Sequence, residues 1–570
     1  MKEKSLESVN RIRILPIVVI AVISLGLAVL FSWNRVSQDY SLQGEYRDIT
    51  ADEFTAGNVE FDTLTGKYTP TADDAWIMYQ GYNDSFSGVM VKLKESVMNP
   101  TVVTVYYSKA NDEILSESHT VIASIDAGHS SCFLSLPNYP VNIVRIDLDL
   151  DCTIDTIALC RTMPAVCNYY ETDFGIAVAV RAVILFAILF LAYCSHRDRI
   201  RKYGYPIKGL FVNPGALGSE HKYEYDYLRT LAALCVIAEH SVCEAYTPNV
   251  SLGDPGYSTL RVILALSLCC NVLYVMLSGA LLLAPREESL KDFYIKRMGK
   301  VLIPTVSYFL LYVLMGYEKE AFANGIGDGV RSILKGLATG RSEYMPHMWL
   351  VYVIIGLYIF APFLRIVVAK ISEGQLFGLI VAGFIFNCLT TYFPIFGITF
   401  GIETPIAGWI GVFLLGYYMT TEHSKKRFGL FVILGIIGLV VTFLMIYFRY
   451  DLLYYTSNWT PNMWLIGAGV FAVFTRFKKI FGRKNIIIAS ISKYNFSIML
   501  IHVLLLLKVV LPFGWSFEAD HGHLTLCIVG MILGCFVLSY IVAFVYDNTA
   551  IAAANYLYDK FFKRNSESGK

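Results

Sequence analysis

The chain has 570 residues, of which 55% are hydrophobic and only 16% charged, and its mean hydropathy is +0.52. Soluble proteins carry roughly 25% charged residues, so this composition excludes an ordinary soluble enzyme. The formal net charge of +1 excludes a strongly basic nucleic-acid-binding protein. Apolar segments of about 20 residues, enough to cross a ~30 Å hydrocarbon core, recur along the chain. We therefore expect a polytopic α-helical membrane protein.

The first apolar segment covers residues 14–32 and follows a basic head that includes Arg11 and Arg13. A basic head before an apolar stretch is typical of a signal peptide as well as of a membrane anchor. The stretch is long for a signal peptide, and no small-x-small cleavage motif closes it. We expect an uncleaved anchor, with a cytoplasmic tail before it.

Residues 34–172 differ from the rest of the chain. They contain eight Lys and Arg but more than twice as many Asp and Glu, which indicates an extracytoplasmic location by the positive-inside rule. Short β-branched and aromatic runs alternate with Gly, Asn, Asp and Pro, a pattern typical of an all-β sandwich or jelly roll. We expect a β-rich domain whose strands include residues 87–93, 101–107, 120–125, 143–150 and 154–159.

A second membrane span, residues 174–194, leads to a basic segment that begins at His196. Ten further spans follow from Tyr223, and alternating them across the bilayer places every dense basic loop in the cytoplasm. We therefore expect about twelve transmembrane helices with both termini cytoplasmic, and an interfacial helix over residues 330–337. The ten later spans are residues 226–246, 260–284, 301–317, 348–369, 375–393, 405–421, 428–447, 461–475, 487–510 and 524–546.

These spans divide the chain into five expected segments. They are a cytoplasmic tail and anchor (1–33), the β-rich domain (34–172), a second helix with a cytoplasmic linker (173–222), a ten-helix domain (223–547) and a cytoplasmic tail (548–570).

Twelve cysteines raise the question of disulfides or metal binding. Eight lie in or beside apolar spans, where cysteine is a common small core residue. The other four, Cys132, Cys152, Cys160 and Cys167, lie in the β-rich segment, where one pair could be oxidised. Neither a CxxC nor an HExxH motif is present, nor is a Walker A motif, so the sequence supports neither metal chemistry nor nucleotide hydrolysis.

The span that begins near Tyr223 carries ionisable residues, which are functional candidates because they are costly inside a membrane. Arg229 and His240 are eleven residues apart, so they share a helical face and lie about 16 Å apart along the axis. Arg229 should lie near the cytoplasmic surface and His240 beyond the middle of the bilayer. Taken alone, the pair is more simply explained by a snorkelling arginine and a packing histidine.

The pair does not stand alone, because this span resembles the first helix of acyltransferase family 3. These integral-membrane enzymes O-acylate cell-surface glycans, and their hallmark is an Arg, ten residues and a His, here Arg229 and His240. The resemblance covers residues 223–547 and does not extend to the β-rich segment. Further motifs match in order at residues 275–279 (Ser-Gly), 293–304 (the basic loop), 347–349 (His-x-Trp), 411–416 and 492–502.

The resemblance implies an acyl-CoA co-substrate, with acetyl-CoA expected, and no metal. Coenzyme A is a cytoplasmic polyanion, so we predict that Arg229, Arg297 and Lys300 bind it, with Lys296 a further candidate. The family often carries Arg-x-x-Arg in the basic loop, where this chain has Arg297 and Lys300. Lysine neutralises a phosphate but cannot form the bidentate fork of an arginine.

A hydroxyl acceptor needs a base to take its proton, and histidine suits this task near neutral pH. We predict that His240 is this base. Glu244 lies one turn further on nearly the same face and is predicted to orient it, while Asp226 could orient Arg229.

Two other histidines are predicted at a comparable depth. His502 lies about 22 Å into its span, and His347 opens a span from the outer side. We predict that His502 is catalytic and that His347 and Trp349 contact the acceptor. The alternative for the last two is an interfacial histidine beside a belt tryptophan.

Together these features predict a multi-pass O-acyltransferase of the cell membrane. Its expected partners are the lipid bilayer and an acceptor that is a cell-surface carbohydrate or a lipid-linked glycan. O-acetylation of a polysaccharide is the expected reaction. A transporter or flippase of glycan intermediates is the main alternative, and inverted repeats with broken helices would favour it. A catalytically silent sensor is a third possibility, against which the intact Arg229–His240 pair argues.

Overall fold

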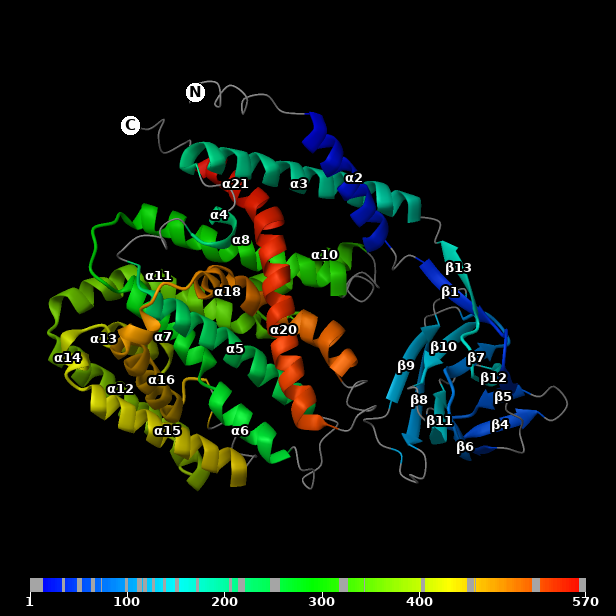
Figure 1. The fold of residues 1–570 in the computed structure, drawn as a ribbon. Coiled ribbons are helices and arrows are strands. Elements are labelled where there is room, and N and C mark those ends of the chain that lie inside the picture. Colours follow the sequence, from blue (N-terminus) through cyan, green and yellow to red (C-terminus); the bar gives the residue numbers. More distant parts are fainter. Residues whose placement is uncertain are drawn as a thin grey trace. The chain divides into compact units, whose positions relative to one another are not determined.

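The computed structural model separates into two compact units. Met1–Ala187 and Phe513–Cys527 form the N-terminal unit, and Ile188–Pro512 and Ile528–Lys570 form the helical unit. Figure 1 shows the order of their elements along the chain. The structure describes residues 14–32, 36–48, 54–62, 67–72, 74–97, 101–109, 115, 120–125, 129–136, 140–148, 153–170, 174–204, 208–213, 221–246, 257–316, 326–342, 344–400, 405–448, 456, 458–514 and 523–562.

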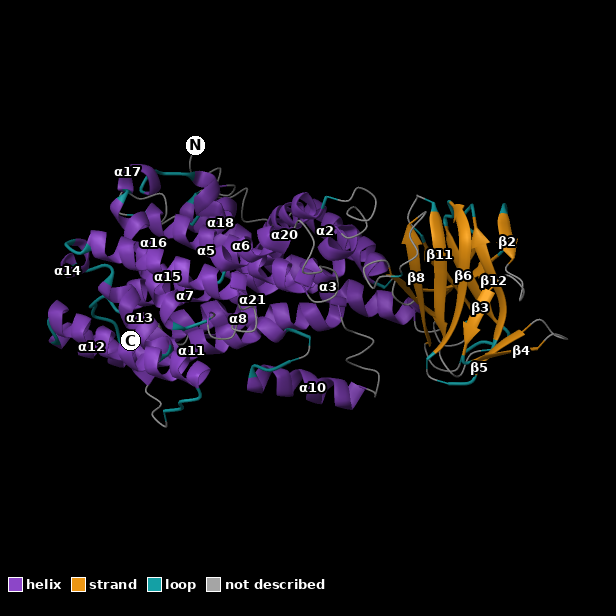
Figure 2. Ribbon diagram, turned by 90° about the horizontal axis from the view of Figure 1, so that it is seen from below, coloured by secondary structure: helices purple, strands orange, loops and turns teal. Residues whose placement is uncertain are grey.

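The N-terminal unit contains two antiparallel β-sheets and a two-stranded ribbon, whose strands are orange in Figure 2. One sheet has the order β3-β6-β11-β8-β9, and the other has the order β10-β7-β12-β5-β4 with β2 also paired to β12; β1 pairs with β13. The strands are β1 (Val36–Ser41), β2 (Tyr46–Asp48), β3 (Phe54–Gly57), β4 (Val59–Asp62), β5 (Lys67–Pro70), β6 (Ala75–Asp84), β7 (Gly88–Leu93), β8 (Thr101–Lys109), β9 (Thr120–Ile125), β10 (Ser131–Ser135), β11 (Val141–Leu148), β12 (Ile154–Cys160) and β13 (Ala165–Tyr170).

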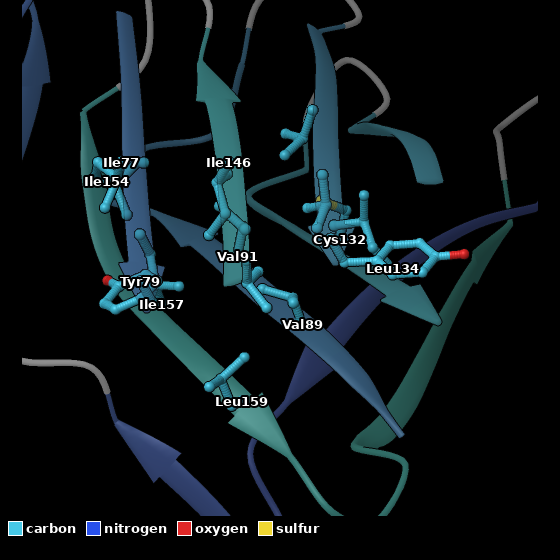
Figure 3. Packing of buried hydrophobic residues seen from close by; sticks show 14 of the residues in the cluster. Ile77, Tyr79, Val89, Val91, Cys132, Leu134, Ile146, Ile154, Ile157 and Leu159 are labelled. Atoms are coloured by element: carbon cyan, nitrogen blue, oxygen red, sulfur yellow. The ribbon is translucent and has the colours of Figure 1, made fainter. Parts of the chain in front are cut away.

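The core of this unit is built from one face of each sheet (Figure 3). Ile77 and Tyr79 of β6 are fully buried in the same cluster as Val89 and Val91 of β7, whereas Met78 between the first two is only partly buried. This alternation is the period of two that a half-buried strand requires. The region is therefore β-rich as predicted, and the five predicted strands correspond to β7, β8, β9, β11 and β12.

Helices make up the rest of the described chain. Among the described residues, nine helices are long and apolar enough to cross a membrane. The helices are α2 (Ile14–Phe31), α3 (Phe174–Tyr203), α4 (Lys208–Phe211), α5 (Tyr223–Tyr246), α6 (Tyr257–Ser267), α7 (Cys270–Leu282), α8 (Leu290–Gly316), α10 (Ile326–Thr339), η4 (Pro346–Met348), α11 (Trp349–Lys370), α12 (Glu373–Tyr392), η5 (Phe393–Phe396), η6 (Pro405–Ala407), α13 (Trp409–Tyr418), α14 (Glu422–Lys425), α15 (Phe428–Phe448), α16 (Pro461–Arg476), α17 (Lys478–Phe481), α18 (Ile486–Leu505), η8 (Leu506–Val510), α20 (Leu524–Tyr546), η9 (Asp547–Ile551) and α21 (Ala552–Phe562).

Each of the twelve predicted spans contains a helix, but three of these helices are not among the nine. Helix α5 carries several charged side chains, α13 has 10 residues and α16 has 16. The structure thus supports a multi-pass helical protein, and the count of twelve spans stays a prediction. The helix predicted over residues 330–337 is present as α10.

Two glycines allow α7 and α13 to pack backbone against backbone. A Cβ atom added to Gly279 would lie 1.9 Å from Phe413 O, and one added to Gly416 would lie 2.0 Å from Met276 O. Small residues at crossings are what permit membrane helices to approach this closely. The two glycines end the Ser-Gly motif and the motif at residues 411–416, so both sequence motifs have a packing role.

We expect Gly279→Ala and Gly416→Ala to destabilise the protein by about 1–3 kcal/mol each, the usual cost of overpacking. Gly378→Ala in α12 is the matched control, because a Cβ there meets nothing within 4 Å. Thermal unfolding of the purified variants in detergent measures the effect. Wild-type stability of both α7 and α13 variants would contradict the close packing.

Candidate functional site

Helices α5 and α18 pack against each other. At one end, Arg229 Nη1 donates to Ser492 Oγ at 3.1 Å, and Asn495 Nδ2 donates to the main-chain oxygen of Arg229 at 2.6 Å. His240 lies eleven residues after Arg229 on α5, and His502 lies ten residues after Ser492 on α18. The centroids of these two rings are 5.1 Å apart. Matching contacts at both ends show that the two helices are parallel and in register.

The carboxylate of Asp226 organises the first of these ends. It is 2% exposed, and its Oδ1 accepts hydrogen bonds from Arg229 Nη1 at 3.0 Å and from Ser492 Oγ at 2.6 Å. Its Oδ2 lies 2.5 Å from His221 Nε2. A buried carboxylate requires such partners, and here they hold the guanidinium of Arg229 at the end of the helix pair.

A cavity of about 440 Å³ lies between α5, α7, α8, α11 and α18. Five basic side chains line it, and no acidic side chain of the described residues does. Concentrated positive charge in a cavity attracts a polyanionic ligand. The basic lining residues are Arg229, Arg286, Arg297, Lys300 and Lys493.

The three residues predicted to bind coenzyme A, Arg229, Arg297 and Lys300, therefore line one cavity. Lys296 does not line it; this exposed side chain lies 3.3 Å from Glu288 Oε1. The structure thus brings together the three assigned cations and leaves the fourth candidate outside.

Sequence reasoning missed two cations of the cavity, Arg286 and Lys493. Lys493 Nζ donates to Gly209 O at 3.0 Å and to Leu210 O at 2.5 Å, and Arg286 donates to Leu281 O at 2.5 Å. Signals for both existed: Lys493 belongs to the motif at residues 492–502, and Arg286 lies seven residues before the basic loop at residues 293–304.

Three histidines from different parts of the chain form a cluster at the other end of the helix pair. His240 lies on α5, His347 on η4 and His502 on α18. Their ring centroids are 5.1 Å apart for His240 and His502, 5.2 Å for His347 and His502, and 6.3 Å for His240 and His347. His502 is 0% and His347 8% exposed. In the described part of the chain, no cluster of three His, Cys, Asp or Glu is arranged to hold a metal.

Main-chain oxygens of α18 determine the tautomers of two of these histidines. His502 Nδ1 lies 2.7 Å from Met499 O, and His347 Nε2 lies 3.0 Å from Leu500 O. A carbonyl oxygen can only accept, so these two nitrogens carry the proton. The opposite nitrogens, His502 Nε2 and His347 Nδ1, are then bare acceptors, and both are buried without a hydrogen-bond partner among the described residues.

The two remaining predicted residues, Glu244 and Trp349, and the unpredicted Glu239 beside His240 have different surroundings. Glu244 belongs to the last turn of α5, and its side chain lies outside the described residues. Glu239 Oε2 accepts from Cys270 Sγ of α7 at 2.9 Å. Trp349 has its ring 6.0 Å from that of Trp409, which lies 5.5 Å from that of Trp459.

The cavity and the histidine cluster are separate positions on shared helices. On α18, Phe496 lines the cavity and precedes His502 by six residues, or about 9 Å of helix. A ligand anchored at Arg229, eleven residues before His240 on α5, would need an arm of about 16 Å to reach the histidines.

Comparison with known proteins identifies the family. A family model described as an acyltransferase domain matches residues 222–540, more than half of the chain and nearly the range of the resemblance. No curated protein and no solved structure matches the chain. The matched range contains the cavity, the Asp226–Arg229–Ser492 contacts and all three clustered histidines. The chain therefore belongs to acyltransferase family 3 and is a membrane acyltransferase.

Proposed function

We propose that this acyltransferase moves an acyl group, expected to be acetyl, from acyl-CoA to a hydroxyl of a cell-surface glycan or glycolipid. The observation that carries the donor half is the cavity, which five basic side chains line. Coenzyme A presents several phosphate groups, and guanidinium groups bind phosphate through paired charge-assisted hydrogen bonds. Arg229, already oriented by Asp226, and Arg297 fit this role, with Lys300 as a point charge.

The acyl thioester would extend from the cations along α18 to the histidine cluster. None of the described residues forms a hydrogen bond with the ring nitrogens of His240 within the structure, so this ring is available to a substrate. His240 takes the proton of the acceptor hydroxyl as its oxygen attacks the thioester carbonyl. The C–S bond then breaks, and the departing coenzyme A thiolate receives that proton.

The acceptor would approach the cluster from the side opposite the cations. This orientation rests on the positive-inside rule and places the β-rich region and Trp349 on the outer side. Trp349 begins a chain of three neighbouring tryptophan rings, whose flat faces are suited to the apolar faces of sugar rings. We propose that His347 and Trp349 border the acceptor path.

We expect Arg297→Ala and Arg229→Gln to weaken coenzyme A binding by roughly 10- to 100-fold each, because a hydrogen bond to a charged group contributes about 1.5–3 kcal/mol. Glutamine at position 229 can still donate to Asp226 and so protects the fold. Isothermal titration of the purified protein with coenzyme A measures the loss. Lys296→Ala is the control and should bind normally; unchanged binding by both arginine variants would refute the donor cavity.

We expect His240→Ala to lower turnover by roughly 10²–10⁴-fold, the usual contribution of a general base, while coenzyme A affinity stays unchanged. Thiol release from acetyl-CoA in the presence of a cell-envelope glycan fraction measures turnover. Glu239→Gln is the neighbouring control, since that side chain contacts α7, and should remain active. Wild-type turnover by folded His240→Ala protein would exclude the base role.

A further inference from the structure

One turn of α18 anchors side chains from two other segments of the chain, η4 and α8. Leu500 O accepts from His347 Nε2 at 3.0 Å and from Tyr312 Oη of α8 at 2.9 Å. The same hydroxyl accepts the main-chain N–H of Leu504 at 2.9 Å, so Tyr312 is inserted at this turn. A side chain inserted into the helical ladder frees carbonyl capacity for other donors. The main chain of this turn therefore holds the rings of His347 and Tyr312 in place.

His502 has one satisfied nitrogen and one unsatisfied nitrogen. Its Nδ1 is bonded to Met499 O, while its buried Nε2 has no hydrogen-bond partner in the described chain. Leaving a buried acceptor unpaired costs about 1–3 kcal/mol, so an orphaned atom in a native site calls for a ligand or a mobile donor.

Among the described groups packed around His502, one candidate donor remains. Tyr312 donates to Leu500 O, His347 donates its Nε2 proton to the same oxygen, and Cys535 Sγ of α20 contacts the main-chain oxygen of His502 at 3.5 Å. The ring of His240, 5.1 Å away, has no such bond in the described structure. Its terminal torsion is broad, and rings at this separation can bring two facing nitrogens within hydrogen-bond distance.

We propose that His502 is the positioning residue of His240, accepting an N–H of that ring through its own Nε2. The bond leaves the opposite nitrogen of His240 bare and directed at the acceptor hydroxyl. This inference rests on the proposed base role of His240. A buried carboxylate does the same in Ser-His-Asp enzymes, whereas here a neutral imidazole acts, itself fixed by Met499 O. The hydroxyl proton moves to the bare nitrogen of His240 and then to the leaving sulfur, and His502 gains no proton.

Two substitutions separate this role from simple anchoring. In His502→Asn the amide nitrogen takes the place of Nδ1 and can still donate to Met499 O, but the acceptor at Nε2 is lost. In His502→Gln the amide oxygen takes the place of Nε2 and can accept from His240, but the bond to Met499 O is lost. Positioning through Nε2 and anchoring through Nδ1 therefore predict opposite orders of activity.

We expect His502→Asn to lower turnover by roughly 10²-fold, the lower end of a general-base contribution, and His502→Gln to remain clearly more active. The KM for acetyl-CoA should be the same in both, since the cations are untouched. Thiol release from acetyl-CoA with the envelope glycan fraction measures turnover, and thermal unfolding verifies folding. An asparagine variant as active as wild type, or more active than the glutamine variant, would overturn the proposal.

Nitrogen-15 spectra of histidine-labelled protein provide a readout that needs no activity. We expect a single His240 tautomer in the wild type and in His502→Gln, and a mixture in His502→Asn. A tautomer mixture in the wild type would overturn the inference whether or not the variants fold. Wild-type protein that shows the single tautomer but no acyl-CoA-dependent transfer would instead refute the proposed function, so the two failures are distinguishable.

Discussion

A polar group between membrane helices needs a partner within the protein, because lipid offers none. This constraint organises the helical unit. The carboxylate of Asp226 brings Arg229 and Ser492 together, and the main-chain oxygen of Leu500 brings Tyr312 and His347 together. The bonds of Ser492 to Asp226 and of Tyr312 and His347 to Leu500 join distant segments of the sequence. The groups proposed for donor binding and for proton transfer are therefore held by the same contacts that close the bundle.

Ionisable residues were the best predictor of the site, since a charge in an apolar span is rarely accidental. That reasoning selected Arg229 and His240, and depth along the spans selected His502 and His347. Arg297 and Lys300, which line the same cavity as Arg229, were selected by the family resemblance and the need of a cytoplasmic polyanion for cations. The sequence could not predict that the main-chain oxygens of Met499 and Leu500 accept hydrogen bonds from His502 and His347. Every residue has a main-chain oxygen, so the residue type gives no indication of such a role. Helical spacing suggested Glu244 as the group that orients His240, whereas the orienting role proposed for His502 could be inferred only from the arrangement of the rings in space.

The fold was predictable where the pattern was long and regular. Strands such as β8 and β12 were found from their alternation, but β2 to β5 have only three or four residues each, too few to show a period of two. Helix α5 illustrates a different difficulty. It carries Asp226, Arg229 and His240, and the polar residues that make it functional also keep it from the nine helices that pass a hydropathy criterion.

The parallel alignment of α5 and α18 fixes the distance, along the helix axes, between the contacts at the two ends of the pair. Sliding one helix by a single turn, about 5.4 Å, would break the Arg229–Ser492 bond and separate His240 from His502 at once. The spacing between Arg229 and Lys493 at one end and His240 and His502 at the other is thus set by two helical backbones and does not depend on loop conformation. In the proposed binding mode, a donor with a coenzyme arm of constant length would present its thioester at one depth whatever acyl chain it carries. Extra methylene groups would then extend past the histidines, so the space beyond His240 and His502 would set the selectivity for acyl length.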